Sequence, residues 1–273
     1  MAEAKKQIPY DLYLKAARNE TITTEELANL GADIDSPATN SVFDDLKILN
    51  RTLLSLSCRE GNLNNVTLLI SLGANPNQEN LNGEAPIHTA CRGGKIEVVE
   101  FLISKGANVN HQTHKGWTPL LFACAYGFPS LVRMLLESGA NPNLGLEDCA
   151  SPVLISAGKG HTQIIEILLE FGADLNTPMI CGASPLLIAT QNEDLDTCRF
   201  LLSKGVDKEK EIHINGAKPL YIAAQKNNLS LVKLLVEAGA DTNAQTSGFI
   251  PIDIAKSLGN IDVVQYLECI SSQ

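Results

Sequence analysis

The sequence repeats itself with a period of about 33 residues. The phrase Gly-Ala-Asn/Asp-x-Asn has clean copies at Gly73, Gly106, Gly139, Gly172 and Gly239, and degenerate copies at Gly31 and Gly205. From Gly73 onward the successive steps are 33, 33, 33, 33 and 34 residues. A second phrase, Ser/Thr-Pro-Leu-x-x-Ala, keeps the same step, with prolines Pro86, Pro119, Pro152, Pro185, Pro219 and Pro251. Such a period indicates stacked copies of one small unit rather than one globular core.

Each copy has the pattern of two short helices followed by a hairpin. In Thr118-Pro119, for example, a hydroxyl that can cap a helix precedes a proline at its first position. The second helix is indicated by apolar residues at helical spacing, as in residues 164–169. The glycine of Gly-Ala-Asn then ends that helix in a left-handed conformation. A further glycine, such as Gly83, turns a predicted β-hairpin back toward the next proline.

Helix, turn, helix and hairpin at this period resemble the ankyrin repeat. The resemblance covers residues 46–273, and more faintly residues 10–35. It implies an all-α repeat solenoid of stacked helix-turn-helix units with β-hairpin fingers. Because such units lack cores of their own and stack on their neighbours, we expect one continuous solenoid rather than two domains.

The phrases also give boundaries. Residues 1–45 are expected to form a degenerate N-terminal capping repeat with a long connection. That connection, residues 36–50, is longer than in the other repeats and is expected to be partly irregular. Residues 46–273 are expected to hold six repeats and a C-terminal capping unit. These lie at approximately 49–81, 82–114, 115–147, 148–180, 181–214 and 215–246, with the cap at 247–273.

Composition excludes several classes of protein. The net charge of −10 disfavours nucleic acid as a partner, because its binders need a positive surface. No apolar run approaches the ~18–20 residues that span a bilayer, so we expect no membrane insertion. Seven cysteines without the apolar segment of a signal peptide indicate a reducing compartment. We therefore expect a monomer in the cytoplasm, with the nucleus as an alternative.

The cysteines and histidines do not form a pattern typical of a metal site, and no catalytic motif is present. Cys58, Cys91 and Cys124 recur at one position of the first helix and are predicted to be core residues. Cys149 and Cys181 fall on neighbouring fingers, which we expect to lie farther apart than the ~7 Å Cα limit for a disulfide. No Gly-x-Ser-x-Gly, phosphate-binding loop or His-Glu-x-x-His occurs. We expect no catalytic residue, no metal and no cofactor.

The resemblance implies that a partner binds the concave side, through the fingers and the exposed ends of the first helices. Residues 46–136 carry eight basic and five acidic residues, whereas both flanking stretches are acidic. The same stretch holds Trp117 and Tyr126, large residues of the kind that dominate protein interfaces. The predicted interface consists of Arg59, Arg92, His114, Lys115, Trp117, Tyr126 and Lys159. An acidic and apolar segment of another protein would suit it.

These features favour a non-catalytic protein–protein interaction module, acting as an adaptor, scaffold or inhibitor. Three alternatives stay open. The chain could block an enzyme's active site as a regulatory subunit, or be an enzyme with an unrecognised site in residues 36–50 and the fingers. It could also be a microbial effector secreted into a host cell, and would then act in the host cytosol.

Overall fold

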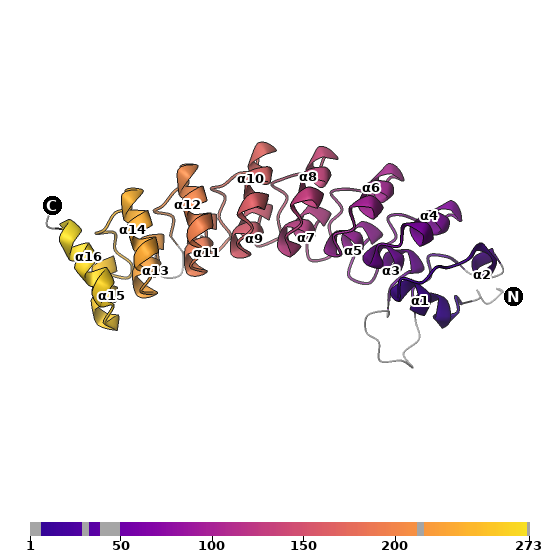
Figure 1. The fold of residues 1–273 in the computed structure, drawn as a ribbon, viewed down its shortest axis with the longest axis horizontal. Coiled ribbons are helices and arrows are strands. Elements are labelled where there is room, and N and C mark those ends of the chain that lie inside the picture. The colour runs from indigo at the N-terminus through magenta and orange to yellow at the C-terminus, as the bar shows by residue number, and fades with distance from the viewer. Residues whose placement is uncertain (1–6, 29–32, 39–49, 212–215, 272–273) are drawn as a thin grey trace. The chain divides into compact units, whose positions relative to one another are not determined.

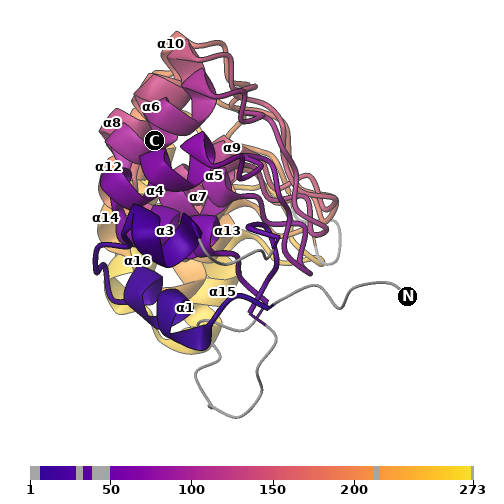
Figure 2. The ribbon, with the colours of Figure 1, turned by 90° about the vertical axis from the view of Figure 1, so that its right-hand side faces the viewer.

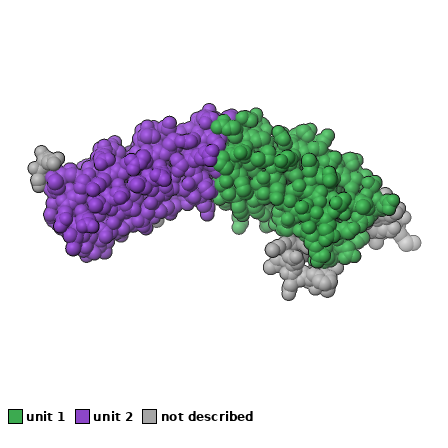
Figure 3. Space-filling model, viewed as in Figure 1, with its two compact units in different colours: residues 1–141 green, residues 142–273 purple. Residues whose placement is uncertain are grey.

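The computed structural model describes residues 7–28, 33–38, 50–211 and 216–271. Within these ranges the chain forms sixteen helices, α1 to α16, and no strand (Figure 1). The all-α repeat fold predicted from the sequence is confirmed. Two compact units divide the chain, residues 1–141 and residues 142–273 (Figure 3). The predicted continuity of the stack from one unit to the next stays a prediction.

Unit 1 contains four helix pairs. The first helices of the pairs are α1 (Tyr10–Ala17), α3 (Leu53–Glu60), α5 (Pro86–Arg92) and α7 (Pro119–Tyr126). The second helices are α2 (Thr24–Ala28), α4 (Leu63–Ser71), α6 (Ile96–Ser104) and α8 (Pro129–Glu137). Each first helix packs against the next first helix. The first two residues of the degenerate phrase, Gly31 and Ala32, and most of the predicted long connection fall on residues 29–32 and 39–49, outside the described residues.

Unit 2 repeats this arrangement. Its first helices are α9 (Pro152–Gly158), α11 (Pro185–Gln191), α13 (Pro219–Gln225) and α15 (Pro251–Leu258). Its second helices are α10 (Thr162–Glu170), α12 (Leu195–Ser203), α14 (Leu229–Glu237) and α16 (Ile261–Ser271). Again each first helix packs against the next one. In each unit the loops that join successive pairs, here called fingers, project to one side of the helices (Figure 2).

The predicted helix boundaries follow from capping. Thr118 Oγ1 accepts a hydrogen bond from Leu121 N at 3.1 Å, which satisfies one of the free N–H groups at the start of α7. Ser151 and Ser184 cap α9 and α11 in the same way. At the other end of a pair, Gly73 has φ +93°, the left-handed conformation that glycine adopts without strain.

The fingers are tight turns rather than strands. In the finger of residues 72–85, Gly83 N donates to Asn80 O at 2.9 Å and Asn80 N donates to Glu84 O at 3.0 Å. These two bonds close a hairpin-like turn that is too short to extend into a β-ladder. One isolated bridge between Thr246 and Phe249 is the nearest approach to a strand pair among the described residues.

The core of each unit lies between the two helix layers. Cys58, Cys91 and Cys124 are fully buried at equivalent positions of α3, α5 and α7, as predicted. Small side chains at these positions let neighbouring first helices approach closely. Leucines and valines of the second helices, such as Val99 and Leu135, fill the space behind them.

The last asparagine of Gly-Ala-Asn-x-Asn joins successive repeats. Asn110 Nδ2 donates to Gly139 O at 3.0 Å, and its Oδ1 accepts from Asn141 N at 2.8 Å. Asn77 makes the same pair of bonds to the following repeat, with Gly106 O and Asn108 N. An amide makes both bonds because it donates and accepts. The carboxylates at this position in the degenerate copies, Asp35 and Glu209, accept the second bond, from Asn75 N and Asp241 N. This explains why the phrase recurs.

Candidate functional site

A hollow of about 280 Å³ opens in unit 1 between the finger of residues 72–85 and the finger of residues 105–118. It is lined by Asn82, Glu84, Arg92, Thr113, His114, Lys115, Trp117 and Phe122. The fingers supply six of these residues, α5 supplies Arg92 and α7 supplies Phe122. The hollow therefore combines finger residues with side chains from the first helices, which is the composition predicted for the interface.

An aromatic pair and a guanidinium group form one wall. The ring centroids of Trp117 and Phe122 lie 4.9 Å apart with the planes tilted by 31°. The guanidinium carbon of Arg92 lies 4.7 Å from the Phe122 centroid, within the range of a cation–π interaction. These contacts join Trp117, Phe122 and Arg92 into one wall of the hollow.

One carboxylate lies between two guanidinium groups. Glu84 is ion-paired with Arg92, and Arg51 Nη1 lies 3.7 Å from Glu84 Oε2. Burial would raise the pKa of Glu84, but the charge and hydrogen bond of Arg92 and a hydrogen bond from Asn80 outweigh it, so the pKa is lowered. Burial lowers the pKa of Arg51, partly offset by Glu84. Two cations share one anion, so this cluster keeps a net positive charge.

Four of the predicted interface residues line this hollow: Arg92, His114, Lys115 and Trp117. His114 and Lys115 are exposed, whereas Trp117 is half-buried against Phe122 rather than fully projecting.

The other three predicted residues lie elsewhere. Arg59 Nε, near the end of α3, is 2.7 Å from Glu60 Oε1. Tyr126 ends α7 and is 53% exposed. Lys159 is an exposed residue of unit 2, next to the end of α9.

The sequence-based interface omits four of the eight lining residues, Asn82, Glu84, Thr113 and Phe122. Phe122 lies three residues after its proline, where the other repeats with this proline carry Thr89, Ile155, Ile188, Ile222 and Ile254. An aromatic residue at that position is the signal that could have identified it. Glu84 lies two residues before its proline, as Trp117 does, so its place near the surface follows from the repeat. The repeat pattern does not predict that Glu84 pairs with two arginines from different parts of the chain, Arg51 and Arg92.

Buried His88 packs against Phe122, one of the residues that line the hollow. Its Nδ1 accepts from Ala85 N at 3.0 Å and its Nε2 lies 3.0 Å from His111 O, to which it donates. Its ring packs edge-on against Phe122, with the centroids 5.8 Å apart. Burial is the main cause that lowers the pKa of His88 to about 4. The side chain is therefore a neutral structural residue at neutral pH.

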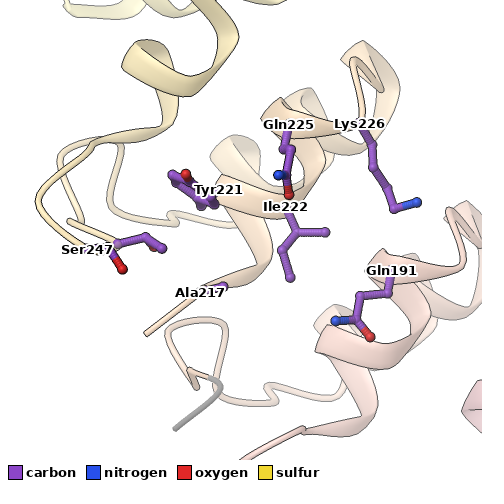
Figure 4. A pocket seen from close by; sticks show the side chains of 8 residues that line it. Gln191, Ala217, Tyr221, Ile222, Gln225, Lys226 and Ser247 are labelled. Atoms are coloured by element: carbon purple, nitrogen blue, oxygen red, sulfur yellow. The ribbon is translucent and has the colours of Figure 1, made fainter. Parts of the chain in front are cut away.

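Unit 2 has a larger hollow, of about 440 Å³. Gln191 reaches it from α11, Tyr221, Ile222 and Gln225 from α13, and Ser247 from the next finger (Figure 4). Lys226, at its edge, lies 3.6 Å from Glu193. Its polar lining is mainly amide and hydroxyl groups, without the paired aromatic rings or the shared carboxylate of unit 1.

The family assignment rests on both sequence and fold. The family model described as ankyrin repeats (3 copies) matches residues 54–145, 144–212 and 208–271. The chain belongs to the ankyrin repeat family. The crystal structure of the human ASB11 ankyrin repeat domain is similar at 31% identity, with a TM-score of 0.70, covering 80% of this chain and 97% of that one. No curated protein matches the chain.

Ankyrin repeats are generally non-catalytic modules that bind other proteins. Over the described residues, no group of three or more His, Cys, Asp or Glu side chains is placed to hold a metal ion. No helix in the described part of the chain is both long enough and apolar enough to cross a membrane.

Proposed function

We propose that this ankyrin-repeat chain is a non-catalytic adaptor, scaffold or inhibitor that binds another protein through the unit 1 hollow. It acts as a monomer in the cytoplasm. The partner contributes an acidic segment with apolar side chains. The observation that carries the proposal is the wall of Trp117, Phe122 and Arg92 beside a cluster with net positive charge.

Each part of the hollow has a role in this binding. Half-buried Trp117 contacts an apolar side chain of the partner. Tyr126, outside the hollow at the end of α7 and 53% exposed, extends the contact. Exposed Lys115 and His114 attract the acidic residues and raise the association rate. Because the wall is already ordered, binding costs little side-chain entropy.

Affinity capture with matched baits tests this proposal. The purified full chain, Trp117→Ala and Phe249→Ala are immobilised, and proteins retained from a cell extract are quantified by mass spectrometry. Phe249 is a suitable control, because it also lies two residues before a helix proline but in the last repeat, and is 57% exposed.

The expected result is a protein enriched by the native chain and by Phe249→Ala but depleted on Trp117→Ala. Circular dichroism must show equal helix content for the three baits. A partner retained equally by all three baits would place the binding surface elsewhere, and turnover of a small molecule by the purified chain would contradict the non-catalytic role.

A further inference from the structure

Two cysteines occupy successive fingers of unit 2. Cys149 is exposed and Cys181 is half-buried. Cys149 has φ +66°, a left-handed conformation uncommon for a residue with a side chain. The equivalent residues of the two preceding fingers are Gly83 and Gly116, with φ +73° and +78°. A cysteine therefore replaces glycine at the one finger position that favours glycine.

The two fingers are in direct contact. Ile180 N donates a hydrogen bond to Asp148 O at 3.0 Å. Cys149 follows the acceptor residue and Cys181 follows the donor residue, so each cysteine is one residue from this bond. The sequence-based expectation that neighbouring fingers lie too far apart for a disulfide is inconsistent with this contact.

The direction of the Cys149 side chain follows from the equivalent finger of unit 1. There His114 N donates to Asn82 O at 3.0 Å, which is the equivalent bond two repeats earlier in the chain. A Cβ placed on Gly83, the residue after that acceptor, would lie 2.8 Å from His114 N. A side chain at this finger position therefore points at the next finger. For Cys149 the next finger is the segment that contains Ile180 and Cys181.

We propose that Cys149 and Cys181 form a reversible disulfide when the protein meets a hydroperoxide. One thiolate attacks the peroxide O–O bond, which yields a sulfenic acid and releases an alcohol or water. The second thiol attacks the sulfenic sulfur, the S–S bond forms and water leaves. Overall, two thiols and one hydroperoxide give one disulfide, one alcohol or water, and one water. A dithiol reductant reverses the modification by exchange.

The other cysteines are not placed for this chemistry. Cys58, Cys91, Cys124 and Cys198 are buried, and burial raises the pKa of the Cys58, Cys91 and Cys198 thiols. Cys269 is exposed on α16 and serves as an internal reference. In a reducing compartment such a disulfide would be transient, as intracellular disulfides of sensing proteins are.

Peptide mapping tests the proposal. The folded full chain is treated with a small excess of hydrogen peroxide at low protein concentration, and its free thiols are then alkylated. Digestion after lysine and before aspartate releases Cys149 within residues 148–159 and Cys181 within residues 174–193, apart from Cys198. The expected product joins these two peptides, with a yield at least about tenfold above any pairing with Cys269, because held thiols react at a high effective concentration.

Two variants make the result decisive. Cys149→Gly restores the usual finger residue, so it should keep the helix content and lose the linked peptide completely. Cys269→Ser should keep the full yield. Reduction with dithiothreitol should release both peptides. Oxidation of Cys149 and Cys181 to separate sulfinic acids, or linked peptides whose yield rises with protein concentration, would overturn the proposal.

Discussion

At the scale of single residues, burial and hydrogen bonding determine the charge state of His88. The side chain is fully buried, and its two ring nitrogens bond Ala85 N and His111 O. Protonation would put a charge in the core and remove the acceptor that Ala85 N uses. Burial therefore lowers the pKa of this histidine to about 4.

This shift predicts a loss of stability in mild acid. Since the folded-state pKa lies below the unfolded value of about 6.5, the unfolded chain binds the proton first, and stability falls as the pH drops from 6.5 toward 4. Between pH 7.5 and pH 5 the free energy of unfolding should fall by roughly 2 kcal/mol. Urea unfolding at both values measures it.

The control is His88→Leu, which places at this position the residue found in the next repeat, Leu121. The variant should lose most of this pH dependence, whatever its stability at pH 7.5. An unchanged difference between pH 7.5 and 5 would show that His88 is not the group responsible.

At the scale of the repeat element, the hydrogen bonds of the phrase asparagines link each finger to the next helix end. Asn110→Ala removes one donor and one acceptor that join the last two repeats of unit 1. At about 1 kcal/mol for each net hydrogen bond, the free energy of unfolding should fall by roughly 1–2 kcal/mol.

The matched control for this prediction is Asn64→Ala on the exposed face of α4. It should be neutral or slightly stabilising, because alanine favours a helix and no packing is lost. Equal losses from both variants in urea unfolding would mean that the Asn110 bonds contribute nothing specific.

The elements themselves were largely predictable, whereas contacts between fingers were not. Proline, capping hydroxyl and left-handed glycine act within a few residues, so Thr118 and Gly73 reveal α7 and the end of α4 from sequence alone. The bond between Ile180 and Asp148 joins residues 32 positions apart. Its geometry depends on how two turns stack, and no local preference encodes it. The same holds for Arg51, which approaches Glu84 from the preceding repeat.

At the scale of the whole molecule, unit 1 and unit 2 share one plan but differ in surface chemistry. The unit 1 hollow has paired aromatic rings and a positively charged cluster, and the unit 2 hollow has amides and hydroxyls. The repeat fixes where such a hollow can form. The residues two before and six or seven after each proline vary between repeats and set the chemistry of its lining, as Trp117 and Arg92 do in unit 1.

The equilibrium affinity for the captured partner tests the central proposal most directly. Calorimetric titration would compare the native chain with Trp117→Ala and Phe249→Ala, each checked for native helix content. We predict that Trp117→Ala raises the dissociation constant roughly thirtyfold, about 2 kcal/mol, as expected when a central aromatic anchor is truncated. Phe249→Ala should leave it unchanged. Full affinity in Trp117→Ala together with a large loss in Phe249→Ala would contradict the account and assign binding to unit 2.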